Sequence, residues 1–186
     1  MSDFKVVILD HRYEHYEQEK EILSRIGVVP EVCFPENSEE AAKKLHDADG
    51  VICNLFHMDE EIINMLNKCR VISRYGVGYD NIDVESATRK GITVCNVPDY
   101  AAEDAADHAL ALLFNCTRKI SYRDRKVREG FWNLHNDQPC FRMNGRVLGV
   151  IGFGHIGSTL VRKIAGFGFS EILVDSPNTD AALIAT

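Results

Sequence analysis

The sequence predicts an α/β fold with parallel sheets, and three observations support this. Short β-branched runs alternate with longer amphipathic segments along residues 1–98. A further apolar run at 146–152 leads into a glycine-rich turn and a helix-like segment. A last β-branched run, at 171–175, follows that segment. Strands that alternate with helices indicate parallel βαβ units, so we expect layered α/β structure in both parts of the chain.

The first part contains five strand-like runs and three helix-like segments. Ser38, followed by two glutamates, is expected to cap the second helix, and Gly27 is expected to end the first. The predicted strands are 5–10, 28–34, 50–55, 70–76 and 92–98, and the predicted helices are 16–27, 38–50 and 59–69. Pro98 closes this unit of roughly one hundred residues.

The second part opens with an alanine-rich segment, 99–120, that predicts one long helix. The polar and aromatic segment 121–145 is expected to form a helix and then an extended excursion. Its aromatic residues Phe131 and Trp132 would either contact another subunit or fold back onto their own domain. The sequence leaves both alternatives open.

The composition disfavours several classes of partner. A formal net charge of -7 argues against nucleic acid or an anionic membrane as the main partner. No apolar run approaches the roughly 18 residues of a membrane-spanning helix. The N-terminus leads directly into a strand-like run and lacks the layout of a signal peptide. We therefore expect a cytoplasmic protein.

The six cysteines are widely spaced and include no Cys-x-x-Cys pair, so neither a zinc site nor a redox motif is indicated. Cys33, Cys53 and Cys95 lie in or at the ends of predicted strands. We expect buried, reduced thiols and no metal site.

The stretch from Gly152 to Gly157 matches G-x-G-x-x-G between a strand-like run and a helix-like segment, which is the context that dinucleotide binding requires. Gly152 would permit the tight turn, and Gly154 would let backbone amides approach a pyrophosphate at the helix N-terminus. Gly157 would allow close packing of helix on strand. His155 is expected to be exposed at the helix start. The alternative is a glycine-rich turn that serves packing alone.

Asp175 ends the next predicted strand, 23 residues after Gly152. A carboxylate at this position would accept hydrogen bonds from the ribose hydroxyls of a dinucleotide. It would also repel a 2′-phosphate, so the sequence favours NAD over NADP.

The stretch "SRYGVGYDNID", residues 73–83, follows the fourth predicted strand. Its two glycines, Gly76 and Gly78, would expose consecutive backbone amides at the carboxyl end of a parallel strand, where an anion can bind. Arg74 could add a charge-assisted contact to a carboxylate. From these residues alone, a plain turn is an equally good interpretation.

Three stretches in this order resemble the D-isomer-specific 2-hydroxyacid dehydrogenases: "RYGVGYDNID", "GITVCNVPDYAAEDAADHALALL" and "LGVIGFGHIG". The similarity covers nearly the whole chain and is strongest to the branch with C-terminal binding proteins and phosphoglycerate dehydrogenase-like enzymes. The resemblance implies a flavodoxin-like parallel-sheet substrate (catalytic) domain, of which 1–99 would be the N-terminal part. Residues 100–186 would then be a Rossmann NAD-binding domain with only its first two strands.

The resemblance also assigns site residues. Arg74 and the backbone of Gly76, Val77 and Gly78 match the positions that hold the substrate carboxylate beside the nicotinamide. Ala105 matches a cofactor-lining turn where some relatives carry a hydroxyl side chain. The full set of implied cofactor-binding residues is Gly152, Gly154, His155, Ile156, Gly157, Asp175 and Ala105.

The family's reaction transfers hydride between nicotinamide and C2 of a small 2-hydroxy or 2-oxo acid, with a histidine, a glutamate and an arginine as catalytic residues. None of the seven histidines matches the catalytic position, and all three residues would follow Thr186. We therefore expect no catalytic residue in this chain, no turnover by it alone, and an open, apolar sheet edge. Ser176 stands as an insertion before Pro177, ahead of a short alanine-rich tail.

Other functions remain open at this point. By resemblance, the chain could belong to a non-enzymatic, NAD-responsive protein-binding module similar to a corepressor, or be an inactive fragment. The resemblance also implies a homodimer for the full-length protein. The substrate stays unnamed, although the loop "NLFHM" lacks the basic residues that a phosphate-bearing substrate would favour.

Overall fold

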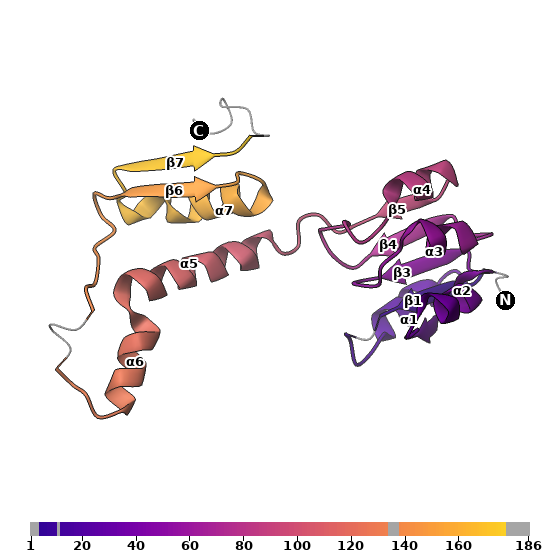
Figure 1. The fold of residues 1–186 in the computed structure, drawn as a ribbon, viewed down its shortest axis with the longest axis horizontal. Helices are drawn as coiled ribbons and strands as arrows, with labels where there is room; N and C mark the ends of the chain where they lie inside the picture. Colours follow the sequence, from indigo (N-terminus) through magenta and orange to yellow (C-terminus); the bar gives the residue numbers. More distant parts are fainter. Residues whose placement is uncertain (1–3, 11, 134–137, 178–186) are drawn as a thin grey trace. The chain divides into compact units, whose positions relative to one another are not determined.

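The computed structural model describes residues 4–10, 12–133 and 138–177. The alanine-rich tail after Pro177 lies outside the described residues. The chain divides into two compact units, Met1–Pro98 and Asp99–Thr186, and each is described by itself (Figure 1).

The first unit is built on a five-stranded parallel sheet with the strand order β2-β1-β3-β4-β5. This is the flavodoxin-like order, so the expected fold class is confirmed. The five predicted strands all form, each shorter than its apolar run. Their bounds are β1 Val6–Leu9, β2 Glu31–Cys33, β3 Gly50–Cys53, β4 Val71–Arg74 and β5 Thr93–Cys95.

Four helices accompany this sheet: α1 Glu17–Ser24, α2 Ser38–Leu45, α3 Glu60–Met65 and α4 Val84–Arg89. The predicted cap of α2 is wrong by one residue, because the side chain of Asn37, not Ser38, accepts the backbone amide of Glu40 at 2.9 Å. The sequence reasoning also missed α4. This helix is one and a half turns long, and Asp83 caps it by accepting the Ser86 amide at 2.9 Å.

The core of the first unit lies between the sheet and its helices. Fully buried aliphatic side chains from the strands and from α2 and α3 form one cluster, as the apolar faces of these segments predict. Its largest members are Leu9, Leu45, Met58, Ile62, Ile63, Leu66 and Ile72. This cluster fixes the carboxyl ends of the strands, from which the candidate sites extend.

The six cysteines do not share one environment. Cys53 and Cys69 are buried, whereas Cys95 and Cys116 are exposed, and none forms a disulfide. The expectation of a buried thiol is wrong for Cys116, on the exposed side of the helix at Ala102–Arg118, and for Cys95. Cys95 lies in β5, an edge strand with only the middle of its three residues partly covered, so its side chain faces solvent.

The second unit contains α5 Ala102–Arg118, α6 Ile120–Arg128, β6 Val147–Ile151, α7 His155–Ile164, a 3₁₀ turn at Ala165–Phe167, and β7 Glu171–Asp175. Lys119, with φ +58°, separates α5 from α6. Helices α5 and α7 are joined by ion pairs of Glu103 with Arg162 and Lys163. The rings of Phe114 and Phe167 meet edge-on, 5.4 Å apart.

Strands β6 and β7 pair in parallel, with Val147 opposite Glu171 and Ile151 opposite Asp175. Side chains alternate along both strands, and one face is covered while Val147, Ile151 and Leu173 on the other are exposed. Among the described residues this sheet therefore exposes an apolar face, whereas the expected open, apolar edge stays a prediction.

The segment after α6 is an excursion without regular structure in its described residues, as the sequence predicts. It is tied back where the Phe141 amide donates to the Thr117 carbonyl at 2.9 Å. Trp132 is 85% exposed, so it does not fold back onto the described residues, whereas Phe131 lies against Lys126, with the ammonium 4.9 Å from the ring centroid. A subunit contact through Trp132 stays a prediction. No helix among the described residues is long and apolar enough to span a membrane.

Candidate functional site

The loop after β4 places a guanidinium beside a run of backbone amides. Arg74 is the last residue of β4 and lies opposite Cys53 of β3. It is half-buried, and its Nε has no hydrogen-bond partner within the described part of the chain. The amides of Gly76, Val77 and Gly78 donate no hydrogen bond among the described residues. Buried donors without partners are uncommon, and Arg74 Nε is one of them, whereas Val77 and Gly78 are exposed and open to a ligand. The group is therefore well suited to an anion.

Gly76 is required by the position of Arg74. A Cβ atom built on Gly76 would lie 1.8 Å from Nη1 of Arg74 and 2.9 Å from Cζ. The guanidinium therefore lies directly over the glycine. Since neither Gly76 nor Gly78 has a positive φ, the first glycine serves close approach and not a left-handed turn.

Two asparagines hold this loop in place. Asn81 Nδ2 donates to the carbonyls of Asn54 and Phe56, at 3.0 and 2.8 Å. Asn96 Nδ2 donates to the Val77 carbonyl at 2.7 Å. The Asn81 bonds tie the loop to the segment after β3, and the Asn96 bond occupies a carbonyl of the loop itself. The amides of the loop are left for another acceptor. Sequence reasoning did not single out either asparagine, although Asn81 is part of the quoted stretch.

The glycine-rich turn of the second unit has the local geometry that its pattern suggests. Gly152 has φ +89°, and its amide donates to the Asp175 carbonyl at 2.8 Å. A Cβ on Gly157 would lie 2.1 Å from the Gly152 carbonyl oxygen, whereas one on Gly154 would meet nothing within 4 Å. The turn is thus tightly packed at Gly157 and open at Gly154, the residue that precedes α7. This arrangement fits the pyrophosphate of a dinucleotide.

The N-terminus of α7 is solvent-accessible. His155 is its first residue, is exposed as expected, and forms an ion pair with Asp99. Ile156 is 49% exposed. Ala105 lies half-buried in the first turn of α5 and presents no hydroxyl.

Asp175 is exposed at the end of β7, next to the glycine-rich turn through its carbonyl contact with Gly152. The hydroxyl of Ser176 accepts the amide of Phe153 at 3.3 Å. Ser176, which looks like an insertion in the sequence, therefore helps to hold the turn. Its position one residue after the predicted acidic residue is the only sequence signal that could have indicated this.

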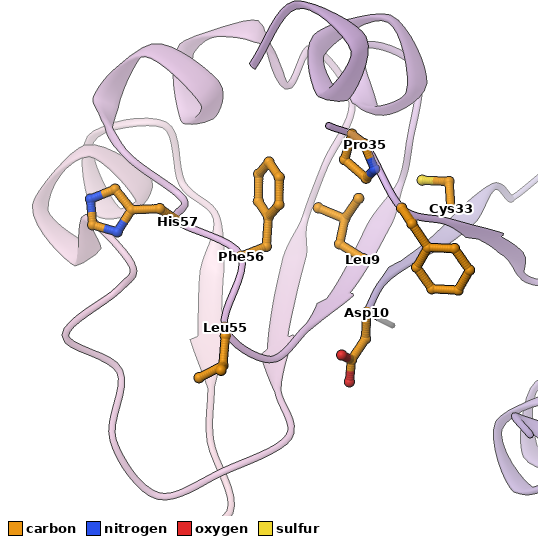
Figure 2. A pocket seen from close by; sticks show the side chains of 8 residues that line it. Leu9, Asp10, Cys33, Pro35, Leu55, Phe56 and His57 are labelled. Carbon is orange, nitrogen blue, oxygen red and sulfur yellow. The ribbon is translucent and has the colours of Figure 1, made fainter. Parts of the chain in front are cut away.

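A pocket of about 400 Å³ lies at the carboxyl ends of the strands in the first unit (Figure 2). Leu9, Asp10, Cys33, Phe34, Pro35, Leu55, Phe56 and His57 line it. The residues come from the ends of β1, β2 and β3. Sequence reasoning did not single out Asp10. No group of three or more potential metal ligands occurs among the described residues.

Comparison with known proteins shows the family. The family model described as "D-isomer specific 2-hydroxyacid dehydrogenase, catalytic domain" matches residues 6–183. The chain is 37% identical to a glyoxylate reductase of Korarchaeum cryptofilum over 146 residues, which are 76% of this chain and 44% of that protein. The chain belongs to the D-isomer-specific 2-hydroxyacid dehydrogenase family, as its motifs suggest.

Solved structures agree in fold. An acyclic imino acid reductase in complex with NADPH and D-Arg superposes with a TM-score of 0.83 and 27% identity, covering 96% of this chain and 58% of that one. NAD⁺-bound 3-phosphoglycerate dehydrogenase of Entamoeba histolytica gives 0.74 and 26%, covering 97% and 56%. The chain therefore spans about half the length of the proteins it matches.

Proposed function

We propose that this chain supplies the carboxylate-binding and NAD-binding elements of a dehydrogenase that acts on a small 2-hydroxy or 2-oxo acid. The observation that carries the proposal is that a chain of this family holds two anion-accepting loops, one in each unit. One is the Arg74 loop of the first unit, and the other is the turn between β6 and α7. In this assignment 1–99 belongs to the substrate domain and 100–186 to the NAD-binding domain.

Each loop has a distinct task. The Arg74 guanidinium and the amides of Gly76, Val77 and Gly78 would clamp the substrate carboxylate and so fix the orientation of its C2 atom. The Gly152–Gly157 turn and the first residues of α7 would hold the pyrophosphate, with Asp175 accepting from ribose hydroxyls. Ala105 and Ile156 would line the cofactor. Bound NAD would supply the hydride acceptor or donor.

The two loops bind but do not move protons. The family's general acid/base is a histidine, and no histidine of this chain matches it. We therefore expect residues 1–186 alone to bind NAD without turnover. Incubating the chain with NADH and a panel of 2-oxo acids tests this, and steady oxidation of NADH would overturn it. We further propose that the full-length protein is a cytoplasmic homodimer.

A binding experiment tests the cofactor assignment. The chain is titrated with NAD⁺ and with NADP⁺ by calorimetry, and NAD⁺ is expected to bind more tightly because Asp175 would repel a 2′-phosphate. Asp175→Ala should narrow this preference, whereas Glu171→Ala, at the other end of the same strand, should leave it unchanged. Absence of NAD⁺ binding at millimolar concentration would contradict the assignment. NAD-dependent dimerisation of the full-length protein without turnover would favour the non-enzymatic alternative.

A further inference from the structure

The pocket in Figure 2 lies at the topological switch point of the sheet. In the order β2-β1-β3-β4-β5, the direction of strand addition reverses between β1 and β3. The pocket is lined by residues that follow β1, β2 and β3, so it straddles that point. Open parallel sheets bind their ligands at the carboxyl ends of strands beside a switch point. Its volume of about 400 Å³ is in the range of small-molecule sites.

The walls of this pocket suit an apolar body. Five of the eight lining residues are apolar: Leu9, Phe34, Pro35, Leu55 and Phe56. Leu9 is buried in the core below, whereas Leu55 is 57% exposed. The lining residues include neither lysine nor arginine. His57 supplies the one imidazole of the lining, so the pocket offers an anion much less than the Arg74 loop does.

Asp10 is the charged group of the pocket, and it is 5% exposed. Its Oδ1 accepts the Arg12 amide at 3.0 Å, and its Oδ2 accepts Nδ2 of Asn54 at the long distance of 3.4 Å. No lysine, arginine or histidine of the described residues forms an ion pair with it. Buried carboxylates are normally paired with a cation, and within the described residues Asp10 has no such partner.

The two thiols near Asp10, those of Cys33 and Cys53, do not change the charge of this pocket. Burial raises the pKa of Cys53 to about 12, against the opposing effect of the Arg74 cation. Burial, reinforced by the charge of Glu31, also raises the pKa of Cys33, which lines the pocket. Both thiols stay protonated at neutral pH. Neither thiol therefore adds a negative charge beside Asp10.

We propose that this pocket binds an organic ammonium group carried on a small apolar body, with the Asp10 carboxylate as its counter-ion. The ammonium would complete the hydrogen bonding of Asp10, and the apolar body would lie against Leu55 and Phe56. The lining of this site includes no residue of the Arg74 loop, and the site selects the opposite charge. The proposal does not depend on the dehydrogenase activity.

Three probes of similar shape test the charge preference. Benzylamine, benzyl alcohol and benzoate are each titrated into the ¹⁵N-labelled chain at pH 7 and followed by NMR. Benzylamine is expected to shift the amides of Asp10, Leu55 and Phe56 and to bind about tenfold more tightly than benzyl alcohol, because hydrogen bonds to charged groups are the stronger ones. Benzoate should not bind there. Equal affinities for the amine and the alcohol, or shifts confined to other residues, would overturn the proposal.

Two variants assign the effect to the pocket. Asp10→Asn keeps the shape of the side chain and is expected to lower benzylamine affinity to that of benzyl alcohol. Asp47→Asn, the same change at the Lys5 ion pair, is the matched control and should bind normally. Because Asp10→Asn could unfold the chain, Leu55→Lys at the exposed rim provides a second test. Its tethered ammonium should block benzylamine, and unchanged affinity would count against the site.

The ammonium could belong to a separate ligand or to the far end of a substrate whose carboxylate binds Arg74. Comparison of hexylamine with 6-aminohexanoate distinguishes the two sources. Tighter binding of 6-aminohexanoate that is lost in Arg74→Leu supports one bifunctional ligand. Equal binding of the two supports a separate amine site. Failure of both to bind would overturn the ammonium assignment while leaving the proposed dehydrogenase function intact.

Discussion

The hydroxyl of Tyr75 donates a hydrogen bond of 2.8 Å to Oε1 of Glu19 and thereby joins the loop after β4 to α1. The Tyr75 ring also meets that of Tyr13 edge-on, with centroids 5.4 Å apart. Burial, followed by the Glu19 hydrogen bond, raises the pKa of the Tyr75 phenol above its usual 10.0. Because Tyr75 stands between Arg74 and Gly76, this contact anchors the backbone of the carboxylate loop.

Tyr75→Phe should lower the free energy of unfolding by about 1 kcal/mol at neutral pH, because this hydrogen bond is lost. The raised pKa adds a pH dependence. Above pH 10 the unfolded chain releases the phenol proton while the folded protein keeps it, so the stabilisation from Tyr75 is lost as the pH rises. Urea unfolding at pH 7 and at pH 10.5 measures both effects. Tyr79→Phe, an exposed tyrosine on the same loop, is the control. Equal pH slopes for the wild type and Tyr75→Phe would contradict this account.

Gly76→Ala should lower the affinity for a carboxylate while leaving the stability of the fold nearly unchanged. The added methyl group would meet the flexible end of the Arg74 side chain, which can move away. The free energy of unfolding should therefore change by less than about 1 kcal/mol. Displacement of the guanidinium should lower affinity for oxalate, a dicarboxylate probe, by about tenfold, as in Arg74→Leu. An NMR titration with oxalate checks this. Wild-type affinity in Gly76→Ala would show that the placement of Arg74 over this glycine is not needed for binding.

Gly157→Ala is expected to behave differently, because the added methyl group would meet backbone. The nearest atom is the carbonyl oxygen of Gly152 at 2.1 Å, so α7 and the turn must separate. A loss of about 1–3 kcal/mol in the stability of the second unit follows. Gly149→Ala, where nothing lies within 4 Å, provides the matched control in β6. Thermal unfolding monitored by circular dichroism distinguishes the two variants, and similar melting temperatures would refute the packing argument.

Thiol reactivity should follow burial. Cys95 and Cys116 are exposed and should react quickly with a disulfide reagent at pH 8. Cys53 is fully buried with a pKa raised to about 12, and Cys69 is also buried, so both should react only after unfolding. Mass spectrometry of peptides after timed labelling gives the order, with denatured protein as the reference. Early labelling of Cys53 would mean that β3 opens readily.

The alternation of apolar runs was enough to predict the strands of the first unit and its fold class. Short elements were harder, because α4 has six residues and its stability comes from the Asp83 cap and tertiary packing, not from periodicity. The Arg74 loop and the glycine-rich turn could be predicted from the sequence because the residues of each are contiguous. The switch-point pocket was not, because Asp10, Cys33 and Leu55 come together only when β1, β2 and β3 align. Burial of Asp10 is a property of that alignment.

The bare face of β6 and β7 has a consequence for handling the protein. Val147, Ile151 and Leu173 keep contact with water, and within the described ranges neither outer edge of the strand pair has a neighbouring strand. The free energy falls whenever another apolar surface covers such a surface and removes it from water. Residues 1–186 prepared alone should therefore bind hydrophobic dyes in the native state and become turbid as the protein concentration rises. Dilution, more than a change of buffer, is then the remedy for studying this unit in solution.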